Sequence, residues 1–304
     1  MTGPDFVPRL FDVGEPNAVS DGVVVEVLAS SVNEFDRAAA RGRFTGPRRQ
    51  RDPVLLGRDF VGTVLTVGDD VNYIDAGMYV AGALAPHAAG QTGTFTDKVA
   101  VPAQSLAPVP DGVDLARVAG VGLAGVTALD AVGALRISGL HTVLIHGPVS
   151  GVGGFALQLA KARGALVAAL TNPEQAELAW MLGADVVIPD GADSAQSVHK
   201  VRHLFGEGVD SAIHVAGDPA VAANAVRAGG RFTTVVGATT TVMGAASEFV
   251  PTVIAPNGHK LADLLFKVAA LRLRSQVSAT VSFDQLGAAL SPHNNDAGRV
   301  VVLR

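Results

Sequence analysis

The stretch from Thr142 to Lys161 limits the fold of this chain more than any other, because it joins a strand, a glycine turn and a helix start. The β-branched apolar run 142–145 predicts a buried parallel strand, and a helical pattern begins near Gly151. At such a helix start, free N–H groups and the helix dipole favour an anion, and glycines let a phosphate approach closely. A tight turn without a ligand is the alternative. We expect a dinucleotide to be bound by Gly147, Ser150, Gly151, Val152 and Gly153.

Composition sets the outer limits of the interpretation. A length of 304 residues predicts about two domains, and 48% hydrophobic against 17% charged residues favours a large core over disorder. The formal net charge of -5 argues against general nucleic-acid affinity. The absence of cysteine excludes disulfides, a thiolate zinc site and a cysteine nucleophile.

The termini and the apolar runs bear on localisation. Residues 1–16 lack the basic-then-apolar pattern of a secretory signal. No apolar run approaches the roughly 20 residues that a membrane span needs. We therefore expect a cytoplasmic protein without a membrane partner.

The N-terminal third reads as a small β unit. Its short apolar runs are bounded by glycine, proline or aspartate, a spacing typical of a small barrel. They cover residues 23–28, 60–67, 78–81, 94–101 and 106–109. Asp114 is a candidate N-cap for a helical segment over 115–134, which we expect to lead into a second domain.

From Thr142 onward, strands and helices alternate as in a doubly wound parallel α/β sheet. The expected strands are 142–146, 165–170, 185–188, 210–215, 231–236 and 249–255, and the expected helices are 151–163, 173–182, 194–205 and 218–228. A helix over 259–270 follows. Strand patterns at 276–283 and 299–303 then suggest that the chain returns to complete the first domain.

Several ordered motifs together carry a family resemblance. They are Ser31–Asp36, Pro53–Gly68, Gly93–Pro102, Leu123–Ala128, Ser150–Gly153, Leu182–Asp185, Ala228–Arg231 and Gly298–Val302. In these motifs the chain resembles the medium-chain dehydrogenase/reductase superfamily, in its zinc-free quinone oxidoreductase (zeta-crystallin-like) branch. The resemblance implies a GroES-like β-barrel catalytic domain over 1–115 and 272–304. It also implies a Rossmann domain over 116–271, with the cofactor in a cleft between the two.

The resemblance also bears on zinc. Zinc-dependent relatives carry a cysteine where this chain has Asn33, and Gly-His-Glu where it has Gly57-Arg58-Asp59. His199 and His203 are spaced i, i+4 on a predicted helix, but no third ligand is near in sequence, so a solvated helix face is the favoured interpretation. Without a metal Lewis acid, hydride transfer to a quinone or an activated enone fits better than alcohol oxidation.

The choice of nicotinamide cofactor depends on the end of the second Rossmann strand. A carboxylate there would hold the 2′-hydroxyl of NAD, but the first one along the chain is Glu174. Thr171 and Asn172 are small donors of the kind that NADP-binding relatives have, which favours NADPH. NADH remains a second candidate, because the family's usual lysine is replaced around Gln175 and a family tyrosine aligns with Asp190.

Other cofactor and catalytic candidates come from the resemblance. Thr127 matches the family threonine at the nicotinamide, and Asn33 is a candidate to orient a substrate carbonyl or the cofactor. Asp36 reads as a structural cap or ion-pair partner, and His146 as either a cofactor contact or a packing residue. No side chain emerges as the general acid, so the proton is expected from solvent. The remaining cofactor candidates are Val215, Ala216, Gly217, Val236, Gly237 and the cation Arg299, with Arg163 as a further cation.

An arginine-rich segment leaves the substrate class open. Its seven arginines are Arg37, Arg41, Arg43, Arg48, Arg49, Arg51 and Arg58. They form either a docking patch for an anionic substrate or acyl carrier, or a solvated loop. We expect an NADPH-dependent reductase of quinones or α,β-unsaturated carbonyls. The alternatives are an enoyl reductase of a polyketide or fatty-acyl pathway and a non-catalytic NADPH-binding protein. A homodimer is expected through the apolar edge strand 249–255.

Overall fold

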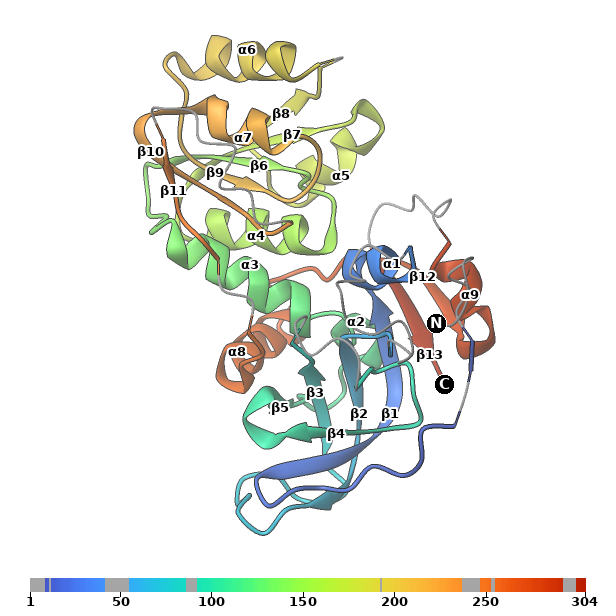
Figure 1. Cartoon of the computed structure of the whole chain (residues 1–304). Coiled ribbons are helices and arrows are strands. Elements are labelled where there is room, and N and C mark those ends of the chain that lie inside the picture. The colour runs from blue at the N-terminus through green and yellow to red at the C-terminus, as the bar shows by residue number, and fades with distance from the viewer. Residues whose placement is uncertain are drawn as a thin grey trace. The chain divides into compact units, whose positions relative to one another are not determined.

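The computed structural model describes residues 9–10, 12–41, 55–85, 92–191, 193–236, 247–252, 255–291 and 299–304. Gly237 and the arginines at 43, 48, 49 and 51, which the sequence analysis singled out, lie outside the described residues. The chain forms two compact units, one of residues 1–126 with 254–304 and the other of residues 127–253 (Figure 1). Each unit is described by itself below.

The second unit is built on a parallel sheet. Its strands are β6 (Thr142–His146), β7 (Leu166–Thr171), β8 (Val186–Pro189), β9 (Val209–His214), β10 (Val226–Thr234) and β11 (Glu248–Phe249). They are ordered β11-β10-β9-β6-β7-β8, and every neighbouring pair is parallel. The order reverses between β6 and β9, which is the switch point where dinucleotides bind in doubly wound sheets. The predicted fold class is therefore confirmed.

Helices cover both faces of this sheet. They are α4 (Gly151–Ala162), α5 (Ala176–Met181), α6 (Ser194–Phe205) and α7 (Pro219–Ala225), with the 3-10 turn η3 (Pro173–Gln175) before α5. Helix α4 packs on β6 and β7 from one side, while α6 and α7 lie on the other side (Figure 1). The core on the α6 and α7 side is aliphatic around Phe232, as expected for strands buried on both faces.

The first unit contains a seven-stranded sheet. Its strands are β1 (Gly22–Val32), β2 (Asp59–Val67), β3 (Tyr79–Ala83), β4 (Lys98–Pro102), β5 (Leu106–Pro108), β12 (Val277–Ser282) and β13 (Arg299–Leu303). The order is β12-β13-β1-β2-β3-β5, with β4 also paired to β1. Strand β13 pairs antiparallel with β1, so the C-terminal segment does complete the first unit.

Short helices close the first unit. They are α1 (Glu34–Ala40), α2 (Leu115–Val118), α8 (Gly258–Ala269) and α9 (Leu286–Ala289), with the 3-10 turns η2 (Ala103–Ser105) and η4 (Phe283–Gln285). Helix α3 (Gly122–Ala134) begins in the first unit and ends in the second. Among the described residues, no helix combines the length and the apolar character that a membrane span needs.

Some boundaries differ from the expected ones. Residues 116–126 and 254–271 belong to the first unit, because α8 packs on β5, β3 and α2. The expected helix over 115–134 divides into α2 and α3, and α7 ends where Val226 pairs with Val209. The last sheet strand has two described residues, Glu248 and Phe249. Helix α1 was not predicted, because its capping depends on the carboxylate of Asp36 folding back onto the N–H of Asn33.

Candidate functional site

The glycine turn after β6 packs directly against the loop that follows β9. Gly147 has a φ of +88°, and a Cβ at this position would lie 2.8 Å from the Cβ of Ala216. Both the positive φ and the contact require glycine here. The structure thus brings together two sequence-predicted residues that are far apart in the chain.

Ser150 sets the start of α4. Its Oγ accepts a hydrogen bond from the N–H of Gly153 at 3.0 Å and donates one to the carbonyl of Gly147 at 3.0 Å. A Cβ at Gly153 would lie 2.0 Å from the Gly147 oxygen, so the turn closes only with glycine at this position. The N–H groups of Gly151 and Val152 have no acceptor within the helix, because they belong to its first turn. They are the donors that such a turn offers to a phosphate.

The loop after β9 is tied to the end of β6. The N–H groups of Val215 and Ala216 both donate to the carbonyl of His146, at 2.9 and 3.2 Å. Gly217 has a φ of +86°, and a Cβ on it would lie 2.5 Å from Nε2 of His146. The predicted strand-end residues therefore surround the imidazole of His146 at the carboxyl edge of the sheet.

Two buried histidines lie side by side at this edge. The rings of His146 and His214 are 5.5 Å apart at 66°, on adjacent strands in register. His214 Nε2 is 3.1 Å from the Gly217 carbonyl, and its Nδ1 is 2.8 Å from Thr234 Oγ1. Because a carbonyl only accepts, Nε2 carries the proton that is donated to Gly217. Sequence reasoning missed His214, although a histidine that ends a predicted buried strand was the available signal.

Burial determines the charge state of this pair. Burial lowers the pKa of His146, and the nearby carboxylate of Asp190 opposes that effect without overcoming it. Burial also lowers the pKa of His214, and the charge of His146 acts in the same direction. Both rings are therefore neutral near pH 7. A neutral His146 donates from Nε2 to Asp190 Oδ2 at 3.3 Å.

The end of β7 is where the sequence places the choice of cofactor. The Thr171 hydroxyl donates to Oε1 of Gln175 at 2.9 Å, and the Thr171 carbonyl accepts from the N–H of Asp190 at 2.9 Å. Asn172 is exposed. The structure thus places Asp190 beside the two expected small donors.

The catalytic candidates Asn33 and Thr127 fall in different units. Thr127 is 2% exposed within α3, at the first position of the second unit. Asn33 lies in the first unit, where its Nδ2 donates to Oδ2 of Asp59 at 2.9 Å. The same carboxylate accepts from Ser31 Oγ at 2.8 Å and from the N–H of Leu123. This network orients the Asn33 amide, because a flipped amide would turn its oxygen toward the carboxylate.

The residues at the family's zinc positions do not fit a metal. Asp59 commits both carboxylate oxygens to protein donors, and the buried cation Arg58 stands where zinc-dependent relatives carry a histidine. The guanidinium of Arg58 donates to the carbonyls of Thr92 and Leu55, each at 3.1 Å, and lies over the ring of Phe35. Among the described residues, no group of three or more histidine and carboxylate side chains could hold a metal ion.

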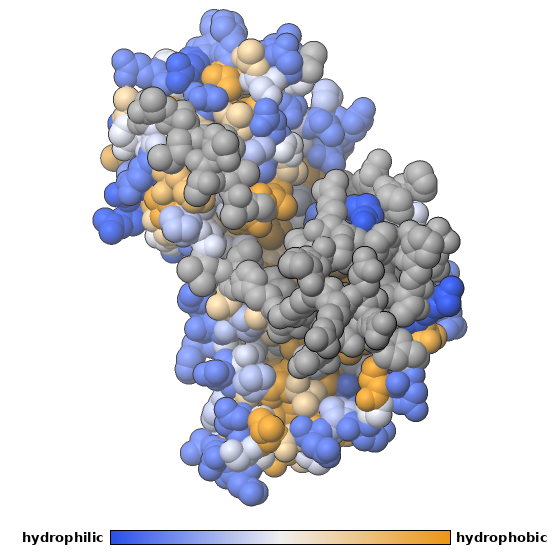
Figure 2. All heavy atoms as spheres, viewed as in Figure 1, coloured by the Kyte–Doolittle hydropathy of each residue, from blue (hydrophilic) through white to orange (hydrophobic). Residues whose placement is uncertain are grey.

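The remaining histidine pair lies on the surface of α6. The rings of His199 and His203 stack with centroids 6.3 Å apart, and both side chains are exposed. The visible surface over α6 is mainly hydrophilic (Figure 2). A solvated helix face remains the interpretation that fits both observations.

Two predicted cations have structural roles. Arg299 was expected to bind the cofactor, but it is buried in β13, where burial lowers its pKa and the charge of Asp59 opposes that effect. A Cβ on Gly120 would lie 2.0 Å from its Nη1, so the guanidinium fills a space inside the first unit. Arg163 donates to the carbonyl of Val132 at 2.7 Å. A cofactor role for either residue stays a prediction.

The first unit is a seven-stranded β sheet, and the second is a doubly wound parallel sheet with a glycine turn before α4, which is the architecture of a dinucleotide-binding domain. Family models agree in chain order. Residues 19–111 match an alcohol dehydrogenase GroES-like domain, and residues 151–267 match a zinc-binding dehydrogenase domain. Together the two models cover both domains of the medium-chain dehydrogenase/reductase superfamily, to which the chain belongs.

Individual relatives show how far the likeness extends. A mitochondrial NAD(P)H oxidoreductase of Mus musculus is 32% identical over 202 residues, which are 60% of this chain and 50% of that protein. A chloroplastic NADPH-dependent alkenal/one oxidoreductase of Arabidopsis thaliana is 31% identical over 191 residues, 61% and 49% of the two chains. The matched region thus spans about half the length of these relatives. The structure of a quinone oxidoreductase from Coxiella burnetii superposes with a TM-score of 0.83 at 23% identity, covering 100% and 96% of the two chains, which shows the shared fold.

Proposed function

We propose that this protein is a zinc-independent reductase that passes a hydride from NADPH to a quinone or an α,β-unsaturated carbonyl compound. The observation that carries the proposal is the glycine turn and the start of α4 at the carboxyl edge of the parallel sheet. The names of the relatives, which include an NADPH-dependent alkenal/one oxidoreductase, support the same chemistry.

Each part of the turn has a role in holding the cofactor. The N–H groups of Gly151 and Val152 donate to the pyrophosphate, and the α4 dipole favours its charge. Gly147 and Gly153 leave room for the phosphate oxygens, while Ser150 holds the turn closed. The loop Val215–Gly217 lies against this turn. Val236, which follows β10, has 40% of its surface exposed.

The polar cluster around Asp59 supports chemistry without zinc, because its donors and acceptors satisfy one another. Bound nicotinamide would supply the hydride, and the protein would supply orientation and proximity. A conjugated acceptor needs no Lewis acid to take up the hydride, and solvent provides the proton. We propose Thr127 and Asn33 as the side chains that orient cofactor and acceptor.

A binding titration followed by a substrate panel tests the proposal. Purified protein is titrated with NADPH and NADH, and NADPH oxidation is then followed with quinones, enones and enoyl thioesters. Oxidation with a quinone or enone is expected. Failure to bind either nucleotide would refute the proposal. Binding without oxidation by any acceptor would favour a non-catalytic protein, and oxidation with enoyl thioesters alone would indicate an acyl-pathway reductase.

We also propose a homodimer. Strand β11 forms one edge of the six-stranded sheet, and pairing with a second copy would protect that edge. Light scattering after size exclusion distinguishes a dimer from a monomer, and a monomer at all concentrations tested would exclude this arrangement.

A further inference from the structure

A contact between side chains crosses the carboxyl end of β7. The sheet order places β7 between β6 and β8, and neighbouring strands lie roughly 4.8 Å apart, so β6 and β8 are roughly 10 Å apart. Nevertheless, His146 at the end of β6 and Asp190 directly after β8 meet, with Nε2 3.3 Å from Oδ2. Their side chains must therefore meet beside the end of β7, near Leu170 and Thr171.

This is the position where the adenosine ribose is recognised. In a doubly wound sheet the ribose lies at the end of the strand that follows the phosphate-binding helix, which is β7 here. A carboxylate at that place accepts the 2′-hydroxyl of NAD and repels the 2′-phosphate of NADP. Strand β7 ends in Thr171 and Asn172 without a carboxylate. Asp190 supplies one from the neighbouring strand instead.

Asp190 is ionised and can still accept a hydrogen bond. Its side chain is 29% exposed. Oδ1 accepts from the N–H of Gly191 at 3.0 Å and from the Ser197 hydroxyl. Burial raises the pKa of Asp190, but the bonds from Ser197 and His146 outweigh burial and lower it overall. Among the residues that the structure describes, Oδ2 accepts from the neutral His146 alone, at 3.3 Å, and a carboxylate oxygen has capacity for a second donor.

A lysine lies close to the backbone of Asp190, with its Nζ 3.5 Å from the Asp190 carbonyl oxygen. Lys200 on α6 donates from Nζ to the Pro189 carbonyl at 2.9 Å. Gln175, the side chain bonded to Thr171, is neutral. The end of β7 therefore presents a negative charge from Asp190, and the lysine is occupied with a backbone carbonyl.

We propose that Asp190 determines how this protein chooses between the two nicotinamide donors. Its carboxylate accepts the 2′-hydroxyl of NADH and repels the 2′-phosphate of NADPH, so NADH serves as a donor beside NADPH. The inference rests on the proposed function, because it concerns the adenosine end of the same cofactor site.

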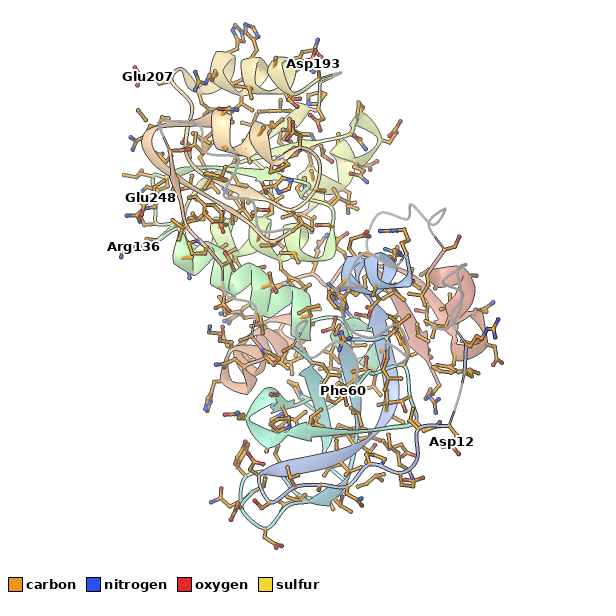
Figure 3. The ribbon with its side chains drawn as sticks, in the orientation of Figure 1. Asp12, Phe60, Arg136, Asp193, Glu207 and Glu248 are labelled. Atoms are coloured by element: carbon orange, nitrogen blue, oxygen red, sulfur yellow. The ribbon has the colours of Figure 1, made fainter. Side chains whose placement is uncertain are left out.

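The test compares Asp190→Asn with the parent protein in titrations with NADH and NADPH. The variant keeps the shape and removes the charge. We expect NADPH to bind more tightly and NADH more weakly, with the ratio of the two Kd values changing about tenfold, as expected for removing one nearby charge in a partly exposed site. Glu207→Gln is the matched control, because it removes the same charge just after the C-terminus of α6, while Asp193 marks the other end of that helix (Figure 3). It should leave the ratio unchanged.

Further variants keep the inference refutable. Asp190→Ser retains an acceptor for Ser197 and should give the same shift if the asparagine variant folds poorly. An unchanged Kd ratio in a folded Asp190 variant would overturn the inference. A tenfold change of the Kd ratio in Glu174→Gln or Lys200→Gln, with no change in Asp190→Asn, would also overturn the inference. It would show that another charged residue determines the choice between NADH and NADPH. If the parent protein binds neither nucleotide, the proposed function itself fails. If the parent binds and oxidises NADPH but the ratio does not move, only this inference fails.

Discussion

The buried carboxyl of Asp36 should make the stability of this protein depend on pH. Asp36 is fully buried, and burial raises its pKa from 3.8 to about 6. Its oxygens accept from the N–H groups of Asn33 at 2.9 Å and Gly57 at 2.8 Å, which oppose the shift without cancelling it. The perturbation is Asp36→Asn, which removes the ionisation and keeps the size.

The size of the effect on the free energy of unfolding follows from the pKa shift of Asp36. A change of about two pKa units corresponds to about 3 kcal/mol. Because the folded-state pKa lies above the unfolded value, the folded protein binds more protons between about pH 4 and pH 6. The free energy of unfolding therefore falls by about 3 kcal/mol through this window as pH rises. Above it the full penalty of the buried charge is present.

The substitution has a cost of its own. An asparagine has one carbonyl oxygen for two backbone donors, so it leaves the N–H of Asn33 or Gly57 unpaired at a cost of about 1–3 kcal/mol. That cost is present at every pH. Near pH 7 it is offset by the absence of a buried charge, and at low pH it is not.

Urea unfolding followed by circular dichroism at several pH values provides the assay. The difference in unfolding free energy between Asp36→Asn and the parent should change by about 3 kcal/mol in favour of the variant from about pH 3 to pH 7. Asp69→Asn, at an exposed aspartate of the same unit, serves as the control and should show no such change. A pH-independent difference for Asp36→Asn would show that burial does not raise its pKa.

Three further substitutions, one of them with a matched control, test the second unit. Gly151→Asp should weaken NADPH binding at least roughly 30-fold, because it places a like charge beside the pyrophosphate. The melting temperature should stay nearly unchanged, because a carboxylate in the first turn of α4 suits the helix dipole. A Kd for NADPH within threefold of the parent value would mean that the phosphate binds elsewhere. Gly217→Ala should cost about 2–4 kcal/mol, because it adds a clash with His146 to backbone strain. Gly229→Ala is the control, because Gly229 has a similar positive φ but open space where a Cβ would lie, and it should lower the free energy of unfolding by about 1 kcal/mol. Equal losses of unfolding free energy for the two variants in urea would contradict the clash with His146. Asp210→Ala should lower the free energy of unfolding by about 1–3 kcal/mol, because the carboxylate accepts from both the N–H and the hydroxyl of Thr142 at 2.8 Å. An unchanged melting temperature would contradict a stabilising role for these two hydrogen bonds.

Local patterns in the sequence predicted most of the second unit. The strand, turn and helix of β6 and α4 follow from apolar spacing, an N-cap serine and glycines within a dozen residues of one another. Such signals act over one or two turns of chain, so they can be read without knowing the strand order. Short apolar runs also predicted the small β unit and the return of the C-terminal strand, which the pairing of β13 with β1 confirms.

Other features depended on distant partners. Arg299 looked like a candidate cofactor cation, yet the pairing of β13 with β1 buries it beside Asp59. Asp36 was interpreted as a structural cap, but its second bond, from the N–H of Gly57, joins residues 21 positions apart and was not predicted. The long-range terms that decide these cases are burial and pairing of charges, which composition and periodicity do not encode.

By itself, the sequence determined the doubly wound fold, the phosphate turn and the superfamily, because each depends on short-range spacing or on ordered motifs. Only the tertiary structure decided what surrounds the end of β7. His146 contacts Asp190, 44 residues away, although β7 lies between their strands, because both side chains reach past the end of β7. That contact brings a carboxylate to a strand end whose own residues carry none.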